Sequence, residues 1–267
     1  MKTGFIGLGN MATAMISGII KEGIVKPEDI LGSSGTKESL KKAVEAFGIC
    51  GLESNTRVAE EADILVLAVK PQMYEKVIKE IRQSLKDSVI IVSIAPGKTI
   101  EWLKKTLENE KTERKIVRCM PNTPAMVGEG CTGVSFSENM TEDERKLVLK
   151  VLGSFGKAME VPESLMDVVV GVSGSSPAYV FLFIEAMADA AVADGMPRKQ
   201  AYEFAAQAVY GSAKMVLETG MHPGQLKDMV CSPGGTTIEA VRVLEEKGLR
   251  SGIIEAQRAC VKKSKEM

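Results

Sequence analysis

The chain has 267 residues, of which 45 % are hydrophobic and 26 % charged, the balance of a soluble protein with a buried core and one or two domains. Its 34 basic and 35 acidic residues give a formal net charge of −1, which argues against a nucleic-acid partner or an anionic membrane surface. With five cysteines in no CxxC pair and His222 as the only histidine, a metal site or a disulfide framework is not expected.

The N-terminal run and the most apolar helix candidate both favour a cytoplasmic protein with reduced thiols. A strand-like run at residues 3–8 stands at the N-terminus in place of an apolar leader. The most apolar helix candidate, residues 178–193, carries Glu185 and Asp189 in its middle. Two carboxylates near a bilayer midplane would be costly, so we expect a buried helix and no membrane span.

From residue 3 to about 160, short β-branched runs alternate with amphipathic segments, the pattern of parallel βαβ units. Residues 64–69 are apolar without alternation, which indicates a strand covered on both faces. The clearest amphipathic segment spans residues 71–85, where Pro71 suits a first helical turn. Strands are predicted at residues 3–8, 29–33, 64–68, 89–94, 115–120 and 130–136.

After Val161-Pro162 helical patterns continue to the C-terminus, so we predict an α/β domain at 1–161 and an all-α domain at 162–267. Many small side chains allow the helices of the second region to approach closely. So many apolar helices in a short region suggest burial against another subunit, although a self-contained alanine-rich bundle is the plainer alternative. The helices are predicted at residues 176–194, 197–218, 223–230, 237–247 and 249–265.

The turn between the first strand and the first helix matches the pattern G-x-G-x-x-G/A of dinucleotide-binding folds. It reads Gly7-Leu8-Gly9-Asn10-Met11-Ala12. Gly7 permits the tight turn, Gly9 lets a pyrophosphate approach the backbone, and Ala12 lets the helix pack on the strand. The helix N-terminus then faces the phosphates. The alternative is a glycine-rich turn that binds no nucleotide.

The end of the second predicted strand carries no carboxylate. It reads Leu31-Gly32-Ser33-Ser34-Gly35-Thr36-Lys37. NAD-selective sites usually place Asp or Glu there, whereas the hydroxyls and the lysine suit a 2′-phosphate, so we expect NADPH, with NADH also usable. The alternative is an ordinary loop in which Ser34 or Thr36 caps the next helix and Lys37 is solvated.

A second glycine-containing turn precedes a helix in the all-α region. It reads Ser232-Pro233-Gly234-Gly235-Thr236-Thr237. Backbone N–H groups and hydroxyls at a helix N-terminus suit a carboxylate of about amino-acid size. Capping by Ser232, Thr236 or Thr237 is the alternative, although capping does not require two adjacent glycines. His222, which precedes Pro223 at a helix start, is interpreted as a capping or interface residue.

Over essentially its whole length the chain resembles the pyrroline-5-carboxylate reductases. The two turns carry the resemblance together with Ala68-Val69-Lys70-Pro71, Met120-Pro121-Asn122-Thr123-Pro124 and Ser173-Gly174-Ser175-Ser176-Pro177-Ala178-Tyr179. The resemblance implies a Rossmann domain with a mainly parallel sheet and an all-α dimerisation domain. It further implies a homodimer, with a ring of dimers left open, that reduces 1-pyrroline-5-carboxylate to L-proline with NADPH or NADH, the last step of proline biosynthesis.

The resemblance also implies which residues bind the reactants. Those near the cofactor are Ile6, Gly7, Leu8, Gly9, Asn10, Met11, Ser34, Thr36, Asn55, Ala68, Val69, Lys70, Pro71 and Ala95. Those that hold the substrate carboxylate are Ser232, Gly235, Thr236 and Thr237. No catalytic side chain is assigned, because a cyclic imine can enter as its iminium and needs mainly positioning. Val170 stands where many members have a threonine that has been considered a partner of the ring nitrogen.

Two other functions stay open. The β-hydroxyacid dehydrogenases have a similar opening, but they use a lysine in the helical domain, and residues 171–179 contain none. A non-enzymatic NADP-binding regulator would use the first domain alone, and it leaves the Ser232–Thr237 turn unexplained.

Overall fold

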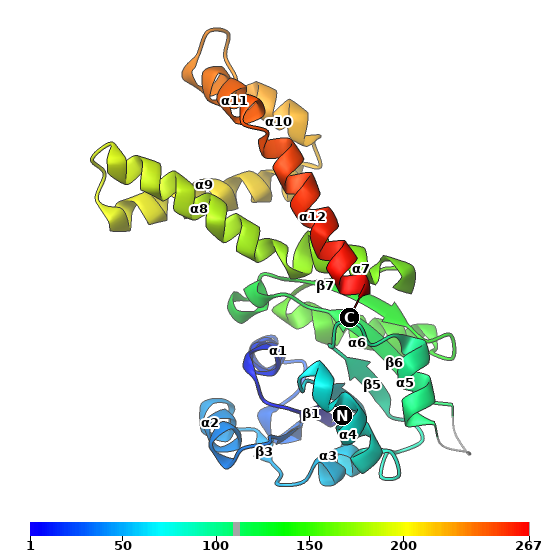
Figure 1. The fold of residues 1–267 in the computed structure, drawn as a ribbon. Helices are drawn as coiled ribbons and strands as arrows, with labels where there is room; N and C mark the ends of the chain where they lie inside the picture. The colour runs from blue at the N-terminus through cyan, green and yellow to red at the C-terminus, as the bar shows by residue number, and fades with distance from the viewer. Residues whose placement is uncertain (109–112, 267) are drawn as a thin grey trace. The chain divides into compact units, whose positions relative to one another are not determined.

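The computed structural model describes residues 1–108 and 113–266, which form two compact units (Figure 1). The first unit holds the chain up to Ser175 together with the last residues from Cys260, and the second holds Ser176–Ala259. Compactness thus groups residues 162–175 with the first unit, whereas the predicted domains divide at residue 162. The assignment of roles to 1–161 and 162–267 stays a prediction.

The first unit is built on an eight-stranded sheet in the order β3-β2-β1-β4-β5-β6-β7-β8. Neighbouring strands are parallel except β6 and β7, which run antiparallel. The order from β3 to β6 is that of a Rossmann fold, so the predicted α/β class with a mainly parallel sheet is confirmed. The strands are β1 (Thr3–Ile6), β2 (Ile30–Ser33), β3 (Cys50–Gly51), β4 (Ile64–Leu67), β5 (Ile90–Ser93), β6 (Lys115–Met120), β7 (Gly130–Phe136) and β8 (Gly156–Glu160).

All six predicted strands are present, and two edge strands were not predicted. β3 has only two residues, and β8 reads Gly-Lys-Ala-Met-Glu, so neither shows the apolar run that reveals a buried strand. β1 ends two residues earlier than predicted because Gly7 takes a φ of +97°, outside the extended region.

Helices cover both faces of this sheet. Along β4, Ile64 and Val66 belong to one apolar core, and Leu65 and Leu67 belong to the other, as the two-residue period of a strand requires. The prediction that this strand is covered on both faces is confirmed. The first core includes side chains of α1 (Asn10–Lys21), α2 (Lys37–Phe47) and α6 (Glu142–Leu152), and the second includes those of α3 (Asn55–Glu61), α4 (Tyr74–Ile81) and α5 (Ile100–Leu107).

Short helical turns connect these elements. The predicted helix at 71–85 begins as a 3₁₀ turn at Pro71, whose ring fixes φ, and continues as α4, which ends at Ile81, four residues before the predicted end. That turn is η2 (Pro71–Met73), and the other turns are η1 (Pro27–Asp29), η3 (Thr123–Val127), η4 (Gly153–Phe155) and η5 (Glu163–Leu165), followed by α7 (Met166–Val169) and the π-helix η6 (Val170–Gly174).

The second unit is helical, as predicted. α8 packs along α9 (Figure 1), and Gly195, with a φ of +98°, turns the chain between them. The predicted starts and ends agree with the observed helices to within one residue. These are α8 (Ser176–Ala193), α9 (Arg198–Thr219), α10 (Pro223–Val230), α11 (Thr236–Glu246) and α12 (Leu249–Lys265), of which α12 ends in the first unit.

The prediction that residues 178–193 form a buried helix is wrong for the single chain. Phe181 and Leu182 on α8 are 62 % and 66 % exposed, and Phe204 on α9 is 68 % exposed. By length and composition alone, the helical stretch Glu163–Ala193 could cross a membrane, which is weak evidence for one. A helix pair in so small a unit covers only its inner faces, and the outer apolar faces need a further partner for burial.

Candidate functional site

The carboxyl ends of the central strands meet at one edge of the sheet. Gly7 N donates a hydrogen bond of 2.9 Å to Ser33 O, and Ala68 N donates one of 2.8 Å to Ile6 O. The loops that follow β1, β2 and β4 therefore start side by side. In an open α/β sheet, ligands bind outside these carboxyl ends.

Gly7 and Gly9, in the turn between β1 and α1, have different structural roles. A Cβ at Gly7 would lie 2.7 Å from Ala68 O, and the positive φ also disfavours any other residue. Gly9 has a φ of −82° as the N-cap of α1, and a Cβ there would have no atom of the described residues within 4 Å. The space beside Gly9 is open, as the approach of a pyrophosphate requires.

The rest of the turn fits a dinucleotide as well. Ala12 is 1 % exposed and packs in the core between α1 and the sheet, where a larger side chain would separate the two. Within the described part of the chain, no side chain caps the N-terminus of α1, so its first N–H groups remain available to an anion.

Asn55 begins α3 and lies against the end of β2. Ser33 Oγ donates to Asn55 Oδ1 at 2.7 Å, and Asn55 Nδ2 donates to Glu80 Oε2 at 3.1 Å. Ser33 is 1 % exposed, so this pair fixes the amide at the sheet edge. The structure thus brings Asn55 to the loop that contains Ser34.

The loop after β2 also begins α2. Thr36 is the N-cap of that helix, and its hydroxyl accepts a hydrogen bond of 3.3 Å from Ser39 N. The capping role considered for Thr36 is therefore present. Ser34 is half-buried, and Thr36 and Lys37 are exposed, so both hydroxyls and the lysine stand where a ligand could reach them.

A buried tyrosine joins the ends of β4 and β5. Tyr74 Oη donates to Leu67 O and accepts hydrogen bonds of 3.3 Å from Ser93 Oγ and Ile94 N. Burial raises the pKa of Tyr74 far above its ordinary value, so its phenol stays protonated. This contact fixes the starts of two loops, one with Ala68–Pro71 and the other with Ala95. The amphipathic pattern of residues 71–85 predicts the helix but carries no sign of the contacts of this hydroxyl.

The Ser232–Thr237 turn lies in the second unit and leads into α11. Gly235 N donates to Ser232 O at 3.0 Å, and Gly234 takes a φ of +66°. Gly235 is the N-cap of α11, and no hydrogen bond from a side chain of the described residues caps this helix. Capping was the alternative role considered for the turn, and the structure does not show it. The backbone N–H groups in the first helical turn of α11 are therefore available to bind an anion.

The single histidine has a structural role. His222 is the N-cap of α10, and its Nδ1 accepts a hydrogen bond of 3.0 Å from Gly224 N. The interpretation of His222 as a capping residue is confirmed. In residues 1–108 and 113–266, no group of three or more His, Cys, Asp or Glu could hold a metal ion.

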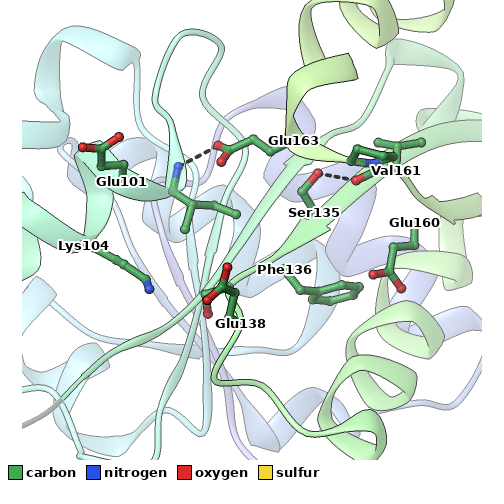
Figure 2. Close-up of a pocket in the computed structure, with 11 residues that line it drawn as sticks. Glu101, Lys104, Ser135, Phe136, Glu138, Glu160, Val161 and Glu163 are labelled. Atoms are coloured by element: carbon green, nitrogen blue, oxygen red, sulfur yellow. Dashed lines mark hydrogen bonds between the residues drawn. The ribbon is translucent and has the colours of Figure 1, made fainter.

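A groove of about 520 Å³ between α5 and the β6–β8 end of the sheet contains none of the predicted site residues. Glu163 and Glu160, two of its acidic side chains (Figure 2), are already engaged. Glu163 accepts hydrogen bonds from Ile100 N at 2.7 Å and from Arg118 at 3.2 Å, and Glu160 pairs with Arg145 at 3.0 Å. Because it contains none of the predicted site residues, this groove is set apart from the candidate site.

Comparisons with known proteins identify both regions of the chain. A family model for pyrroline-5-carboxylate reductase dimerisation matches residues 163–267, and one for NADP oxidoreductase, coenzyme F420-dependent, matches residues 2–97. Pyrroline-5-carboxylate reductase of Escherichia coli is 54 % identical over 266 residues, which cover 100 % of this chain and 98 % of the relative. That of Methanosarcina acetivorans is 46 % identical over 268 residues, with 100 % and 97 % covered.

Solved structures agree with these relatives. The Plasmodium falciparum pyrroline carboxylate reductase with NADP bound superposes with a TM-score of 0.89 at 34 % identity, over 100 % of this chain and 97 % of that one. The Coxiella burnetii pyrroline-5-carboxylate reductase gives 0.91 at 35 %, over 99 % and 97 %. A 3-hydroxyisobutyrate dehydrogenase of Mycobacterium tuberculosis gives 0.53 at 14 %, over 88 % and 71 %, and shares the fold alone.

Proposed function

The chain belongs to the pyrroline-5-carboxylate reductase family, and we propose that its two turns at helix N-termini hold the two reactants. As a member of that family it is an oxidoreductase that reduces 1-pyrroline-5-carboxylate to L-proline with NAD(P)H. The hydroxyacid dehydrogenase and regulator alternatives are not favoured, because full-length relatives at 54 % and 46 % identity are reductases.

The first turn is proposed to bind the nucleotide. Its pyrophosphate would lie beside Gly9 at the N-terminus of α1, with Ile6, Gly7, Leu8, Asn10 and Met11 forming the rest of the turn. Asn55 would contact the adenosine ribose, and Ala68, Val69, Lys70, Pro71 and Ala95 would line the path to the nicotinamide. The open space at Gly9 and the uncapped helix support this placement. When bound, the nucleotide supplies a hydride from its nicotinamide ring.

We propose a preference for NADPH over NADH. Ser34, Thr36 and Lys37 at the end of β2 provide two hydroxyls and one positive charge for a 2′-phosphate, and no carboxylate stands in this loop to hold a 2′-hydroxyl. Thr36 would serve both purposes: its hydroxyl accepts from Ser39 N and donates to Ser39 Oγ at 2.9 Å, and turning this proton towards a 2′-phosphate would leave the N-cap hydrogen bond in place.

The second turn is proposed to bind the substrate carboxylate. Ser232, Gly235, Thr236 and Thr237 would offer hydroxyls and backbone N–H groups, and the helix dipole favours the negative charge. The observation that carries the proposal is the uncapped N-terminus of α11 behind two adjacent glycines. A helix end left without a capping side chain is suited to a ligand.

The protein's catalytic contribution is proposed to be orientation. A cyclic imine protonated in solution already carries the charge that attracts a hydride, so the residues need only hold the ring in line with the nicotinamide. His222 is engaged in capping, and Lys70 is exposed. We therefore expect that no single His, Lys or Asp substitution abolishes turnover.

The helical region makes the chain oligomeric, and we propose a homodimer in which a second copy buries the exposed faces of α8 and α9. Residues 1–161 would bind the nucleotide, and residues 162–267 would bind substrate and dimerise. A ring of such dimers is the larger assembly to test by light scattering. A cytoplasmic location is supported by five cysteines that are all free and all within the described residues.

The kinetics of Thr237→Ala test the substrate site. Loss of a hydrogen bond to a charged group, worth about 1.5–3 kcal/mol, should raise the KM for 1-pyrroline-5-carboxylate by about tenfold or more, with the KM for NADPH unchanged. Thr219→Ala is the control, because that hydroxyl bonds within its own helix to Met215 O at 2.6 Å. An unchanged KM in Thr237→Ala would contradict the assigned carboxylate role.

A further inference from the structure

The side-chain amide of Asn122 is engaged at both ends. Its Nδ2 donates to Ser173 O at 2.9 Å, and its Oδ1 accepts from Cys131 N at 2.8 Å. Asn122 is 7 % exposed and lies in the loop that follows β6. It therefore links the start of β7 to the π-helix Val170–Gly174, and all of these residues belong to the first unit.

The carbonyl of Ser173 has no α-helical donor of its own, because the residue that would supply one is a proline. In an α-helix it would accept from the N–H of residue 177, but that residue is Pro177, which has none. The segment before it is wound more widely, and Ser175 N donates to Val170 O at 2.8 Å. Such π-helical turns are rare and often lie at functional sites. Asn122 supplies from outside the hydrogen bond that the helix cannot make.

The π-helix borders the candidate nucleotide site. Met120 ends β6, which runs parallel to β5, so Asn122 follows the same carboxyl edge as Ala95. A Cβ on Gly174 would lie 3.7 Å from the Cγ of Met120. The backbone of the π-helix is thus packed against the strand end beside the loops proposed to lead to the nicotinamide.

We propose that Asn122 is a positioning residue for imine reduction: by holding Ser173 O it fixes the π-helix as the wall beside the nicotinamide end of the site. This inference rests on the proposed placement of the nicotinamide at Ala68–Pro71 and Ala95. Hydride transfer depends steeply on the distance and alignment of the two rings. A displacement of the π-helix should therefore lower kcat more than it weakens the binding of NADPH.

Asn122→Asp isolates the donor. The new carboxylate keeps the size of the side chain and an acceptor for Cys131 N, but it places a negative oxygen against Ser173 O. The kcat should fall about tenfold or more, as expected for a change above about 1.4 kcal/mol in the barrier. The Kd for NADPH should stay within about twofold, because the pyrophosphate turn is untouched.

A pH profile separates positioning from loss of structure. Protonation turns the new carboxyl into a donor, so the kcat of Asn122→Asp relative to wild type should rise as the pH is lowered. Asn139→Asp is the matched control. Its amide donates to Glu113 O and Arg114 O at 3.2 and 3.3 Å and accepts from Ser137 Oγ at 2.6 Å, away from the carboxyl edge, and it should keep the wild-type kcat.

Three results would overturn the inference: a wild-type kcat in folded Asn122→Asp, an equal loss in Asn139→Asp, or a loss confined to NADPH binding. Should the buried carboxylate prevent folding, Asn122→Ala carries the test, because it too must lose kcat while it keeps NADPH affinity. Failure of the wild type itself to oxidise NADPH with 1-pyrroline-5-carboxylate would instead reject the proposed function.

Discussion

The hydroxyl of Ser264 donates a hydrogen bond of 2.6 Å to the carboxylate of Asp167, although 97 positions separate the two residues. One turn earlier on the same helix, the Cys260 thiol donates to Ser175 Oγ at 3.3 Å. Asp167 lies just before the π-helix, and Ser175 lies just after it. The end of α12 therefore forms hydrogen bonds on both sides of the π-helix, which Asn122 contacts from the loop after β6.

Ser264→Ala should destabilise the protein by about 1.5–3 kcal/mol, the cost of removing a donor from a charged acceptor. Ser264 is 4 % exposed, so water cannot easily take the place of its hydroxyl. Urea unfolding measures the change. Ser251→Ala, on an exposed part of the same helix, should stay within about 0.5 kcal/mol of wild type. Equal stability of the two variants would contradict the role given to the Ser264–Asp167 pair.

Alanine at the two glycines of the nucleotide turn should separate folding from binding. Gly9→Ala meets open space at an ordinary φ, so its Tm should match wild type while its Kd for NADPH rises about tenfold or more, since the new methyl occupies the pyrophosphate's place. Gly7→Ala meets Ala68 O at 2.7 Å with a positive φ, so it should lower the Tm as well. Thermal unfolding and fluorescence titration of both variants test this, and a Gly9→Ala variant with wild-type affinity would reject the proposed turn.

The acid stability of the first unit should depend in part on Asp63. The Lys86 ammonium, together with the backbone N–H of Lys2, holds the pKa of Asp63 below its ordinary 3.8. A lowered pKa in the folded state stabilises the fold above the unfolded-state value, and this contribution is lost as the pH falls through the folded-state value. Asp63→Asn should therefore be less stable than wild type at pH 7, and this deficit should vanish in strong acid.

The size of that deficit is limited by solvent. The Asp63 and Lys86 side chains are 47 % and 37 % exposed, so about 1 kcal/mol or less is expected. Urea unfolding at neutral and acidic pH measures it. Lys86→Met should show the same trend, and a deficit that does not change with pH would rule out the carboxylate as its source.

The sequence was sufficient for the parts of the fold that local physics determines. Runs such as residues 64–67 are apolar at every position because both faces are covered, and Gly7 and Pro71 mark a turn and a helix start through their backbone limits. β3 and β8 were missed because an edge strand with polar or short sequence is defined by its neighbour and not by its own pattern. α8 was predicted to be buried, but in the single chain its outer apolar side chains are exposed.

The site was only partly predictable for a related reason. Helix N-termini and glycine turns are local, so both candidate turns could be read from the chain, as could the capping role of His222. The contacts made by Tyr74, Asn122 and Asp167 join residues 7, 51 and 97 positions apart. No short-range pattern encodes such pairs. The proline at 177, which leaves Ser173 O without an α-helical donor, was the one local signal that could have led to Asn122.

Tyr74→Phe should weaken the support of the loops that are proposed to bind the nucleotide. Its hydroxyl is the shared partner of Leu67 O, Ser93 Oγ and Ile94 N, and Tyr74 is fully buried, so removing the oxygen leaves buried polar groups unpaired at a cost of about 1–3 kcal/mol. The backbone ladder still pairs β4 with β5 up to Leu67 and Ser93, but the loops that follow them lose a shared contact, so the KM for NADPH should rise severalfold while the KM for the imine changes less. Tyr210→Phe, at a half-exposed position, is the control for loss of a phenol. A Tyr74→Phe variant that loses stability but keeps its KM for NADPH would show that the hydroxyl supports the core without shaping the loops, and would remove Tyr74 from the account of the site.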